Sequence, residues 1–197
     1  MAVEGPRGAL YDPAVLLEAA TAVPLAETYA ALHAYLNAHR SPLTVETVLE
    51  NIASPDVRTL LAPLLHGPVV DRDRLRTAHA TAAATARTAL AALRHSEAAA
   101  FLVPTTPLPA PPLGTGPWVD FGDRTGATFT TYIRNTAPAA VWGWPSLTVP
   151  AGRTASGLPV GLLLDAPRHH DRSLLGLGRL CARHLNASSH LPSPGTI

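Results

Sequence analysis

The sequence predicts an α/β protein, in which helices are followed by strands with further helices between them. Two observations lead to this class. Up to about residue 98 apolar residues recur with helical spacing, and from residue 99 onward short apolar runs bounded by proline or glycine appear. With 197 residues, 47% of them hydrophobic, the chain has enough apolar material for one core. We expect one domain, with a mainly helical layer at 1–98, strands and helices at 99–186 and a tail at 187–197.

The first half is expected to hold three helices. The first spans Asp12–Arg40, because four apolar residues recur there at helical steps: Leu25, Tyr29, Leu32 and Leu36. The second starts at Ser54, which offers a capping oxygen ahead of a proline and an acid, and Pro63 should kink or end it. The third and longest spans Asp71–Arg94. Its stripe is rich in alanine and permits close packing: Leu75, Ala78, Ala82, Ala86, Ala89 and Leu93.

The second half is expected to place three strands in one sheet, with the Asp71–Arg94 helix packed nearby. These strands are Phe101–Val103, Leu147–Val149 and Pro159–Leu164, which are apolar on both faces as strands covered on both sides are. A proline-rich connection follows the first strand, then a short strand at Trp118–Phe121 and a helix at Thr128–Asn135.

A last helix is expected to begin with Asp171 as its N-cap. Its inward side is predicted to consist of Leu174, Leu175, Leu177, Cys181 and Leu185. Its outward side carries Arg172, Arg179 and Arg183.

Composition excludes several classes of function. Charged residues make up 15% of the chain and the formal net charge is +1, so there is no strong field to bind nucleic acid or anionic lipid. No uninterrupted apolar run suggests a membrane span or a signal peptide, and the single cysteine, Cys181, fits a reducing cytoplasm. All 15 basic residues are arginine, which excludes any mechanism that needs a lysine from this chain.

Three segments of the second half carry motifs in a fixed order: FLVPTTPLPAPPLG from Phe101, TFTTYIRNTAPAAVWGWPSLTVPAG from Thr128, and GLPVGLLLDAPRHHDRSLLGLG from Gly157. The residues that form these motifs are Pro104, Thr105, Pro107, Asn135, Pro145, Pro150, Gly152, Leu158, Pro159, Gly161, Asp171, Leu174 and Leu175. Their order and spacing resemble the C-terminal end of amidase-signature enzymes. In the first half, AYLNAHRSPLTVETVLENIASPDVR is similar to the indoleacetamide and mandelamide hydrolase branch.

The resemblance covers Leu16 to His184 but less than half of a family enzyme. It implies the C-terminal part of the amidase-signature fold, a mixed β-sheet covered by α-helices, and hydrolysis of an amide to a carboxylic acid and ammonia. Family enzymes use one serine as nucleophile, a second serine as proton relay and a lysine as base, and backbone amides of a Gly-Ser-rich loop stabilise the oxyanion. This chain has no lysine and no such loop, so we expect no catalytic residue in it and no activity alone.

Other chemistries find little support in the residues. Asp165, His169, His170 and Asp171 match no established metal-ligand spacing, and a solvated loop that caps the last helix is the simpler interpretation, so no metal or cofactor is expected. Gly176–Gly178 resembles the start of a dinucleotide fingerprint but lies inside a helix and lacks the third glycine. A Ser-His-Asp triad remains a weak alternative, since no Gly-x-Ser-x-Gly elbow is present.

Binding is therefore the function to which candidate residues are assigned. In the family, loops between the last strands help to close the acyl pocket, and the matching stretch here contains Tyr132, Arg134, Asn135, Trp142 and Trp144. Two tryptophans around Gly143 are suited to form an aromatic wall for an aryl side chain. The competing interpretation makes Trp142 and Trp144 core or interface aromatics and Asn135 a turn cap.

Three identities stay open at this point. The chain is an amidase part that needs the N-terminal, serine-bearing half as its partner and then acts on a small amide, or a non-catalytic binding or assembly subunit, or a gene remnant. The predicted strands are too few to close a sheet, so an unpaired edge for that partner is expected.

Overall fold

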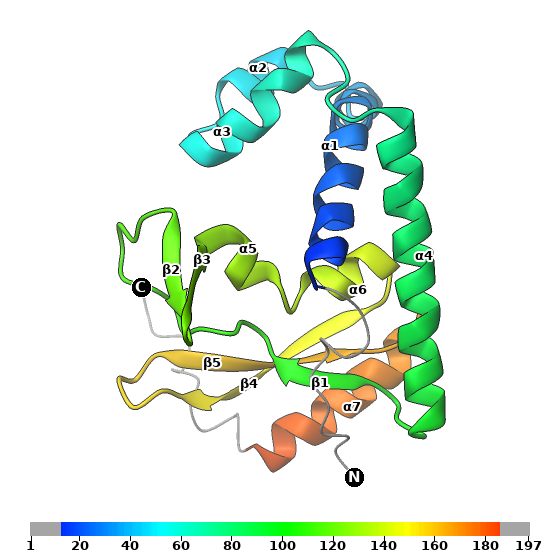
Figure 1. Cartoon of the computed structure of the whole chain (residues 1–197), viewed down its shortest axis with the longest axis vertical. Coiled ribbons are helices and arrows are strands. Elements are labelled where there is room, and N and C mark those ends of the chain that lie inside the picture. Colours follow the sequence, from blue (N-terminus) through cyan, green and yellow to red (C-terminus); the bar gives the residue numbers. More distant parts are fainter. Residues whose placement is uncertain (1–12, 186–197) are drawn as a thin grey trace. The chain divides into compact units, whose positions relative to one another are not determined.

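The computed structural model describes residues 13–185, and the predicted tail lies outside this range. The chain divides into two compact units. A helical unit comprises Glu18–Ala83, and a sheet unit comprises the described residues up to Leu17 and from Ala84 onward. In Figure 1 the helices up to residue 66 are blue to cyan, the long helix at Arg72–His95 is green, and the strands run from green to yellow.

A three-stranded sheet forms the centre of the sheet unit. Its strands are β1 (Phe101–Pro104), β4 (Ser146–Arg153) and β5 (Pro159–Asp165), in the order β1-β5-β4. Both pairings are antiparallel. Leu102 of β1 and Leu147 of β4 lie on either side of Leu164 in the central strand β5. The three predicted strands and their common sheet are thus confirmed, and β4 extends beyond its predicted end through an irregularity between Pro150 and Gly152.

Helix α7 (Asp171–His184) covers one face of this sheet. Leu174 packs there in a buried cluster with Val149, Leu164 and Ala166. Gly178 is also buried, and a Cβ on it would lie 2.2 Å from Leu147 Cδ2, so glycine permits the close approach of helix and strand.

The prediction for α7 was wrong at two points. Leu175 and Leu185 were placed inward, yet Leu175 is 59% exposed and Leu185 is exposed as well, because only one narrow side of the helix meets the sheet. The N-cap is His170 and not Asp171, which is the first helical residue. The predicted outward arginines are exposed.

A second buried cluster of the same unit lies on the opposite face of the sheet. Leu16, Ala89 and Trp142 are buried together, and Phe101, Ala86, Val141 and Trp144 pack against them. Ala89 and Ala86 belong to α4 (Arg72–His95), so the predicted packing of the alanine-rich helix beside the first strand is confirmed. The cluster also receives the first turns of α1 (Pro13–Ala38) through Leu16.

The helical unit has its own small core. Leu36 of α1 is buried with Val45 and Leu49 of α2 (Val45–Glu50) and with Leu64 of η2 (Ala62–His66), a 3-10 helix. Tyr29 and Leu32 pack against this cluster, so the predicted apolar face of the first helix is confirmed. Helix α3 (Pro55–Leu61) ends before Pro63, as expected.

The capping role predicted for Ser54 was wrong. Ser54 is the N-cap residue of α3, but its hydroxyl makes no cap hydrogen bond and instead donates to the Asp56 carboxylate at 2.5 Å. A carboxylate two residues along is the stronger acceptor. Thr44 does act as a side-chain cap, since its hydroxyl accepts from the backbone N–H of Thr47 at the start of α2.

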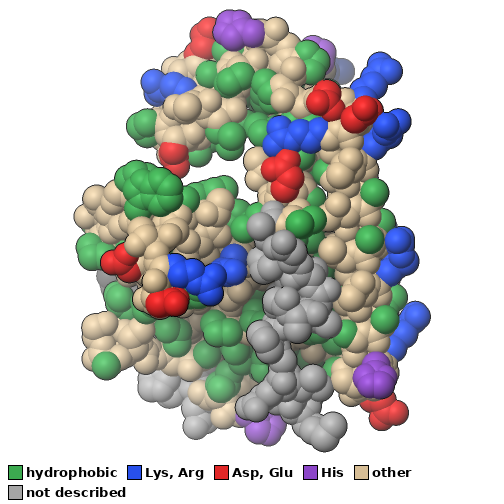
Figure 2. Space-filling view, in the orientation of Figure 1, with side chains coloured by type: hydrophobic (Ala, Val, Ile, Leu, Met, Phe, Trp, Pro, Cys, Tyr) green, Lys and Arg blue, Asp and Glu red, His purple; other side chains and the backbone are tan. Residues whose placement is uncertain are grey.

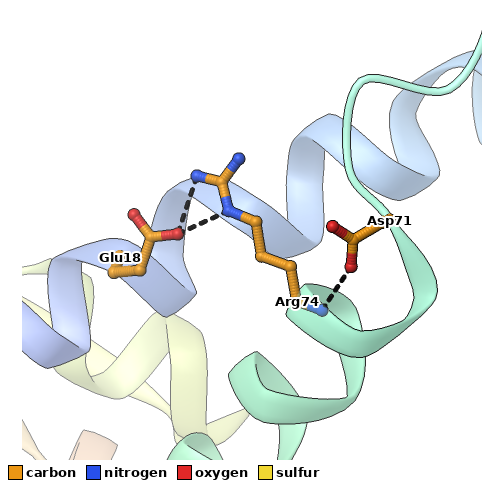
Figure 3. Close-up of polar contacts among 3 residues, drawn as sticks. All are labelled: Glu18, Asp71 and Arg74. Carbon is orange, nitrogen blue, oxygen red and sulfur yellow. Dashed lines mark hydrogen bonds and ion pairs between the residues drawn. The ribbon is translucent and has the colours of Figure 1, made fainter.

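Polar contacts join α1 and α4 within the helical unit. Arg74 donates to Glu18 through Nε at 2.7 Å and Nη2 at 2.7 Å, and its backbone N–H donates to the Asp71 carboxylate that caps α4 (Figure 3). Figure 2 shows basic side chains spaced along α4, where Arg72, Arg76, Arg87 and Arg94 are exposed.

Helix α1 departs from the expectation that no segment of the chain suits a membrane span. From Val15 to Ala38 it is long and apolar enough to cross a membrane by length and composition. It continues through Pro24, and Ala19, Ala22 and Leu25 on it are buried within the protein. Only 17% of this apolar window is buried within the described residues.

Candidate functional site

The proline-rich connection after β1 is held by donors from one short helix. We call residues 105–117 the strap. Helix α5 (Thr128–Ile133) and the residues after it supply the donors: Tyr132 Oη donates to the Pro109 carbonyl at 2.7 Å, Thr128 Oγ1 donates to the Gly116 carbonyl at 2.9 Å, and Asn135 Nδ2 donates to the Pro104 carbonyl at 2.9 Å. The spacing of four and three residues places all three donors on one side.

Proline explains why the strap is held through its carbonyls. Five of the residues from 105 to 117 are prolines, which have no N–H to donate but keep a carbonyl acceptor. Backbone hydrogen bonds to its neighbours are confined to its ends, where the Thr105 N–H donates to the Gly161 carbonyl at 2.9 Å and the Pro117 carbonyl accepts from the Thr128 N–H at 2.8 Å. Leu113 at its turn is fully exposed, with a relative accessibility of 104%.

Arg134 connects the same region to a small hairpin. Strands β2 (Trp118–Phe121) and β3 (Arg124–Ala127) form a separate antiparallel pair, with a turn at Gly122, and the predicted strand at Trp118–Phe121 is confirmed. The Arg134 guanidinium lies over the Phe121 ring, 5.3 Å from its centroid. Such a cation–π contact fixes the orientation of a hairpin that has few buried residues.

The two tryptophans lie at a sharp corner after α6 (Ala137–Trp142), a helix that the sequence analysis did not predict. We call Trp142–Gly143–Trp144 the tryptophan corner. Gly143 ends the helix in the left-handed conformation with φ of 64°, and the Trp144 N–H donates back to the Ala139 carbonyl at 2.9 Å. This backbone conformation favours glycine, whereas the Arg168 Nη2 that a Cβ would meet at 2.6 Å is the end of a flexible side chain that can shift.

The corner brings its two rings together. Their centroids lie 5.0 Å apart with planes tilted by 58°, and Trp144 stacks on Phe101 of β1 at 6.3 Å. Trp142 is only 5% exposed, and its indole Nε1 donates to Thr85 Oγ1 at 2.9 Å. Trp144 is half-buried. Of the two, Trp142 has the surroundings of a core aromatic, and Trp144 is the ring with accessible surface.

Strand β1 contacts two of the candidate residues, one at each of its ends. Asn135 bonds to its last residue, Pro104, while Trp144 stacks on its first, Phe101. Three residue steps along a strand cover roughly 10 Å. Asn135 and Trp144 therefore contact β1 at its two ends, and the five candidates do not converge on a single point.

Sequence reasoning missed several residues of this region. No signal in the sequence sets Thr85 apart, because it is one of four threonines in the alanine-rich helix, with Thr77, Thr81 and Thr88. Ser146 donates a short hydrogen bond to Asp165, a carboxylate with 0% exposure, and Thr105 donates to Thr148 at 3.2 Å across Gly161. A Cβ on Gly161 would lie 2.7 Å from both threonine side chains, so glycine allows them to meet. Among the described residues no group of three or more His, Cys, Asp or Glu side chains is placed to hold a metal ion.

The comparisons with known proteins all point in one direction. A family model described as Amidase matches residues 9–175. The indoleacetamide hydrolase of Agrobacterium vitis is 29% identical over 81% of this chain and 34% of its own length. The mandelamide hydrolase of Pseudomonas putida is 31% identical over 80% of this chain and 32% of its own length.

Solved structures give the same result for the fold. A crystal structure of an amidase, 30% identical, superimposes with a TM-score of 0.65 over 85% of this chain and 35% of that one. The chain thus spans about a third of the length of the relatives it matches, in their C-terminal portion.

Proposed function

This chain belongs to the amidase family, and we propose that it forms the substrate-facing C-terminal part of an amidase that hydrolyses a primary arylacetamide to a carboxylic acid and ammonia. One observation supports the substrate class: relatives named for indoleacetamide and mandelamide align over about four fifths of the chain, 81% and 80%. Both compounds are primary amides with an aromatic ring near the carboxamide, which suits a chain that carries a half-buried aromatic ring at Trp144.

The candidate residues take two roles in this proposal. Trp144 presents its ring to the aryl group of the substrate, and Trp142 supports it from behind, since large flat rings bury much area at little cost in entropy. Tyr132, Arg134 and Asn135 set the strap and the hairpin that border the other end of β1. At this second end the strap contacts the substrate, and the three residues determine its shape.

The acid–base chemistry must come from an N-terminal, serine-bearing portion. Amide hydrolysis by an acyl-enzyme needs a serine activated by a base and donors for the oxyanion, and a chain without lysine cannot supply the family's base. That portion is either joined to this chain or carried by a second polypeptide. Cys181 packs beside α7's buried cluster as a reduced thiol, which fits an enzyme of the cytoplasm.

The sheet offers a surface for that portion. In the order β1-β5-β4 the outer strands β1 and β4 each pair on one side within the described residues. Leu102 of β1 is 51% exposed although it lies on the face that α7 covers. An unpaired edge with an exposed leucine suits addition of a further strand.

Reconstitution tests the proposal. The chain alone and the chain co-expressed with the serine-bearing portion are assayed for ammonia release from indole-3-acetamide and mandelamide. We expect background rates for the chain alone, because loss of a nucleophile and its base removes several orders of magnitude of rate. We expect turnover and a 1:1 complex for the pair, and loss of that turnover when the nucleophilic serine of the partner is changed to alanine.

Two other results would point elsewhere. A 1:1 complex without turnover on any arylacetamide would identify an assembly subunit. A monodisperse, cooperatively melting monomer that binds no hydrophobic dye and no partner would identify a self-sufficient binding domain.

A further inference from the structure

We propose that Thr85 of α4 is a positioning residue for the aryl subsite, because its hydroxyl fixes Trp142 and, through it, the ring of Trp144. The inference rests on the proposed function for the substrate and on the structure for the linkage. Thr85 lies more than fifty residues before the tryptophan corner, in a helix that was expected only to pack.

The first link is the hydrogen bond from Trp142 Nε1 to Thr85 Oγ1, at 2.9 Å. An indole N–H can only donate, and Trp142 is 5% exposed, so its N–H needs an acceptor inside the protein. A bond to this atom determines how the indole is turned about its axis. Apolar contacts alone leave a flat ring more freedom, since they have no direction.

The second link is the contact between the rings. Trp142 and Trp144 are tilted by 58° at 5.0 Å, and Trp144 stacks on Phe101 with an angle of 11° at 6.3 Å. Trp144 is thus held between a ring fixed by Thr85 and a ring fixed by β1. The backbone between the tryptophans is also restrained. The Gly143 carbonyl accepts a hydrogen bond from Arg168, and the Gly143 N–H donates to the last turn of α6.

Specificity follows from this arrangement. Thr85 touches no substrate, yet a change in the tilt of Trp144 alters how well an aryl group fits against it. Loss of the hydroxyl should weaken binding of an aryl amide while leaving the chemical step intact. A small alkyl amide, which does not reach Trp144, should be unaffected.

Two matched substitutions separate the hydroxyl from the packing. Thr85→Val keeps the shape and removes the acceptor, whereas Thr85→Ser keeps the acceptor and removes a methyl group. Both are made in a Trp118→Phe background, in which the remaining tryptophans are Trp142 and Trp144. Trp118 is 64% exposed and outside the corner, so its replacement should leave the fold intact.

The structural readout is ¹⁹F NMR of the full chain labelled with 5-fluorotryptophan, which gives two resonances in this background. We expect Thr85→Val to shift both resonances, including that of Trp144, and Thr85→Ser to retain the parent spectrum. A Thr85→Val spectrum in which the Trp144 resonance stays at its parent position would overturn the proposal, whatever the activity.

The functional readout uses the chain combined with its serine-bearing portion. For phenylacetamide, Thr85→Val should raise KM about threefold to tenfold, the range of a lost hydrogen bond, with kcat unchanged, and propionamide kinetics should stay at the parent values. Equal losses for both amides would show a merely structural role. Shifted resonances with no turnover by the unsubstituted pair would refute the proposed function and leave the linkage from Thr85 to Trp144 standing.

Discussion

Different kinds of contact stabilise the sheet unit and the helical unit, each within itself. In the sheet unit, strands are covered by α7 on one face and by α4, α6 and the start of α1 on the other, with residues such as Leu164 and Ala89 at 1% and 0% exposure. The helical unit has one small cluster around Leu36 and Leu49, and much of its remaining connectivity is polar and exposed, as at Glu18 with Arg74 and Tyr29 with Glu46.

The difference indicates where sequence changes should matter. Burial is worth about 25 cal/mol per Å² of apolar surface, whereas an exposed ion pair or hydrogen bond is worth about 1 kcal/mol or less. All five candidate binding residues lie in the sheet unit. We therefore expect substitutions there to have large effects on stability, and substitutions at the polar contacts of the helical unit to have small effects that depend on pH and salt.

The largest effect is expected for Trp142→Ala. Removal of a buried tryptophan should lower the free energy of unfolding by about 3–5 kcal/mol, since it leaves a cavity against Leu16 and Ala89 and removes the donor to Thr85. Chemical denaturation followed by circular dichroism measures this. Trp118→Ala on the exposed hairpin is the matched control, with an expected change below about 1 kcal/mol. Similar losses for both variants would mean that the corner is not the packed centre described above.

A second prediction uses the two glycines of α7 and expects opposite signs. Gly178→Ala should destabilise the chain by about 1–2 kcal/mol, because its Cβ would meet Leu147 and overpacking outweighs the helix propensity of alanine. Gly176→Ala should stabilise it by up to about 1 kcal/mol, because nothing lies within 4 Å of that Cβ. Thermal melts of both variants give the comparison, and stabilisation by both would show that α7 can move away from β4 at no cost.

Much of the sheet unit could be predicted from sequence. The strands around Phe101, Leu147 and Pro159 were identified because short apolar runs bounded by proline or glycine are typical of buried strands. The order β1-β5-β4 could not be obtained in this way, since pairing depends on contacts between distant residues. The same holds for α6, whose six residues are too few for a clear helical period.

The candidate site was predictable in composition but not in arrangement. The motif pattern located Tyr132, Asn135 and both tryptophans, but their partners are a strap carbonyl, a strand end and a threonine on another helix. The errors at Ser54, Leu175, Leu185 and Asp171 share a cause. The local sequence indicates which residues suit a cap or one face of a helix. Contacts with the rest of the fold determine which of them form the cap or become buried.

The smallest effect is expected at the Tyr29–Glu46 contact of the helical unit, and it is a pH dependence. Tyr29 Oη donates to Glu46 Oε1 at 2.6 Å, and this hydrogen bond, as the main cause, lowers the pKa of Glu46 and raises the pKa of Tyr29. A lowered carboxyl pKa contributes stability that is present above the pKa of the unfolded chain and is lost as the pH falls through the folded value. A raised phenol pKa contributes stability that is present below the unfolded value and is lost as the pH rises through the folded one.

Tyr29→Phe isolates this contribution. The stability difference between the parent chain and Tyr29→Phe should be constant between roughly pH 5 and 9 and should shrink towards both ends of the scale. Because the phenol is neutral in this window, added salt should change the difference little, whereas it should weaken the Glu18–Arg74 ion pair. Urea denaturation at a series of pH values, with Arg74→Gln as the salt-sensitive reference, makes the measurement. A difference that stays flat into acid and alkali would show that the hydrogen bond contributes nothing to folding, and a difference as large as that of Trp142→Ala would remove the distinction between the two units.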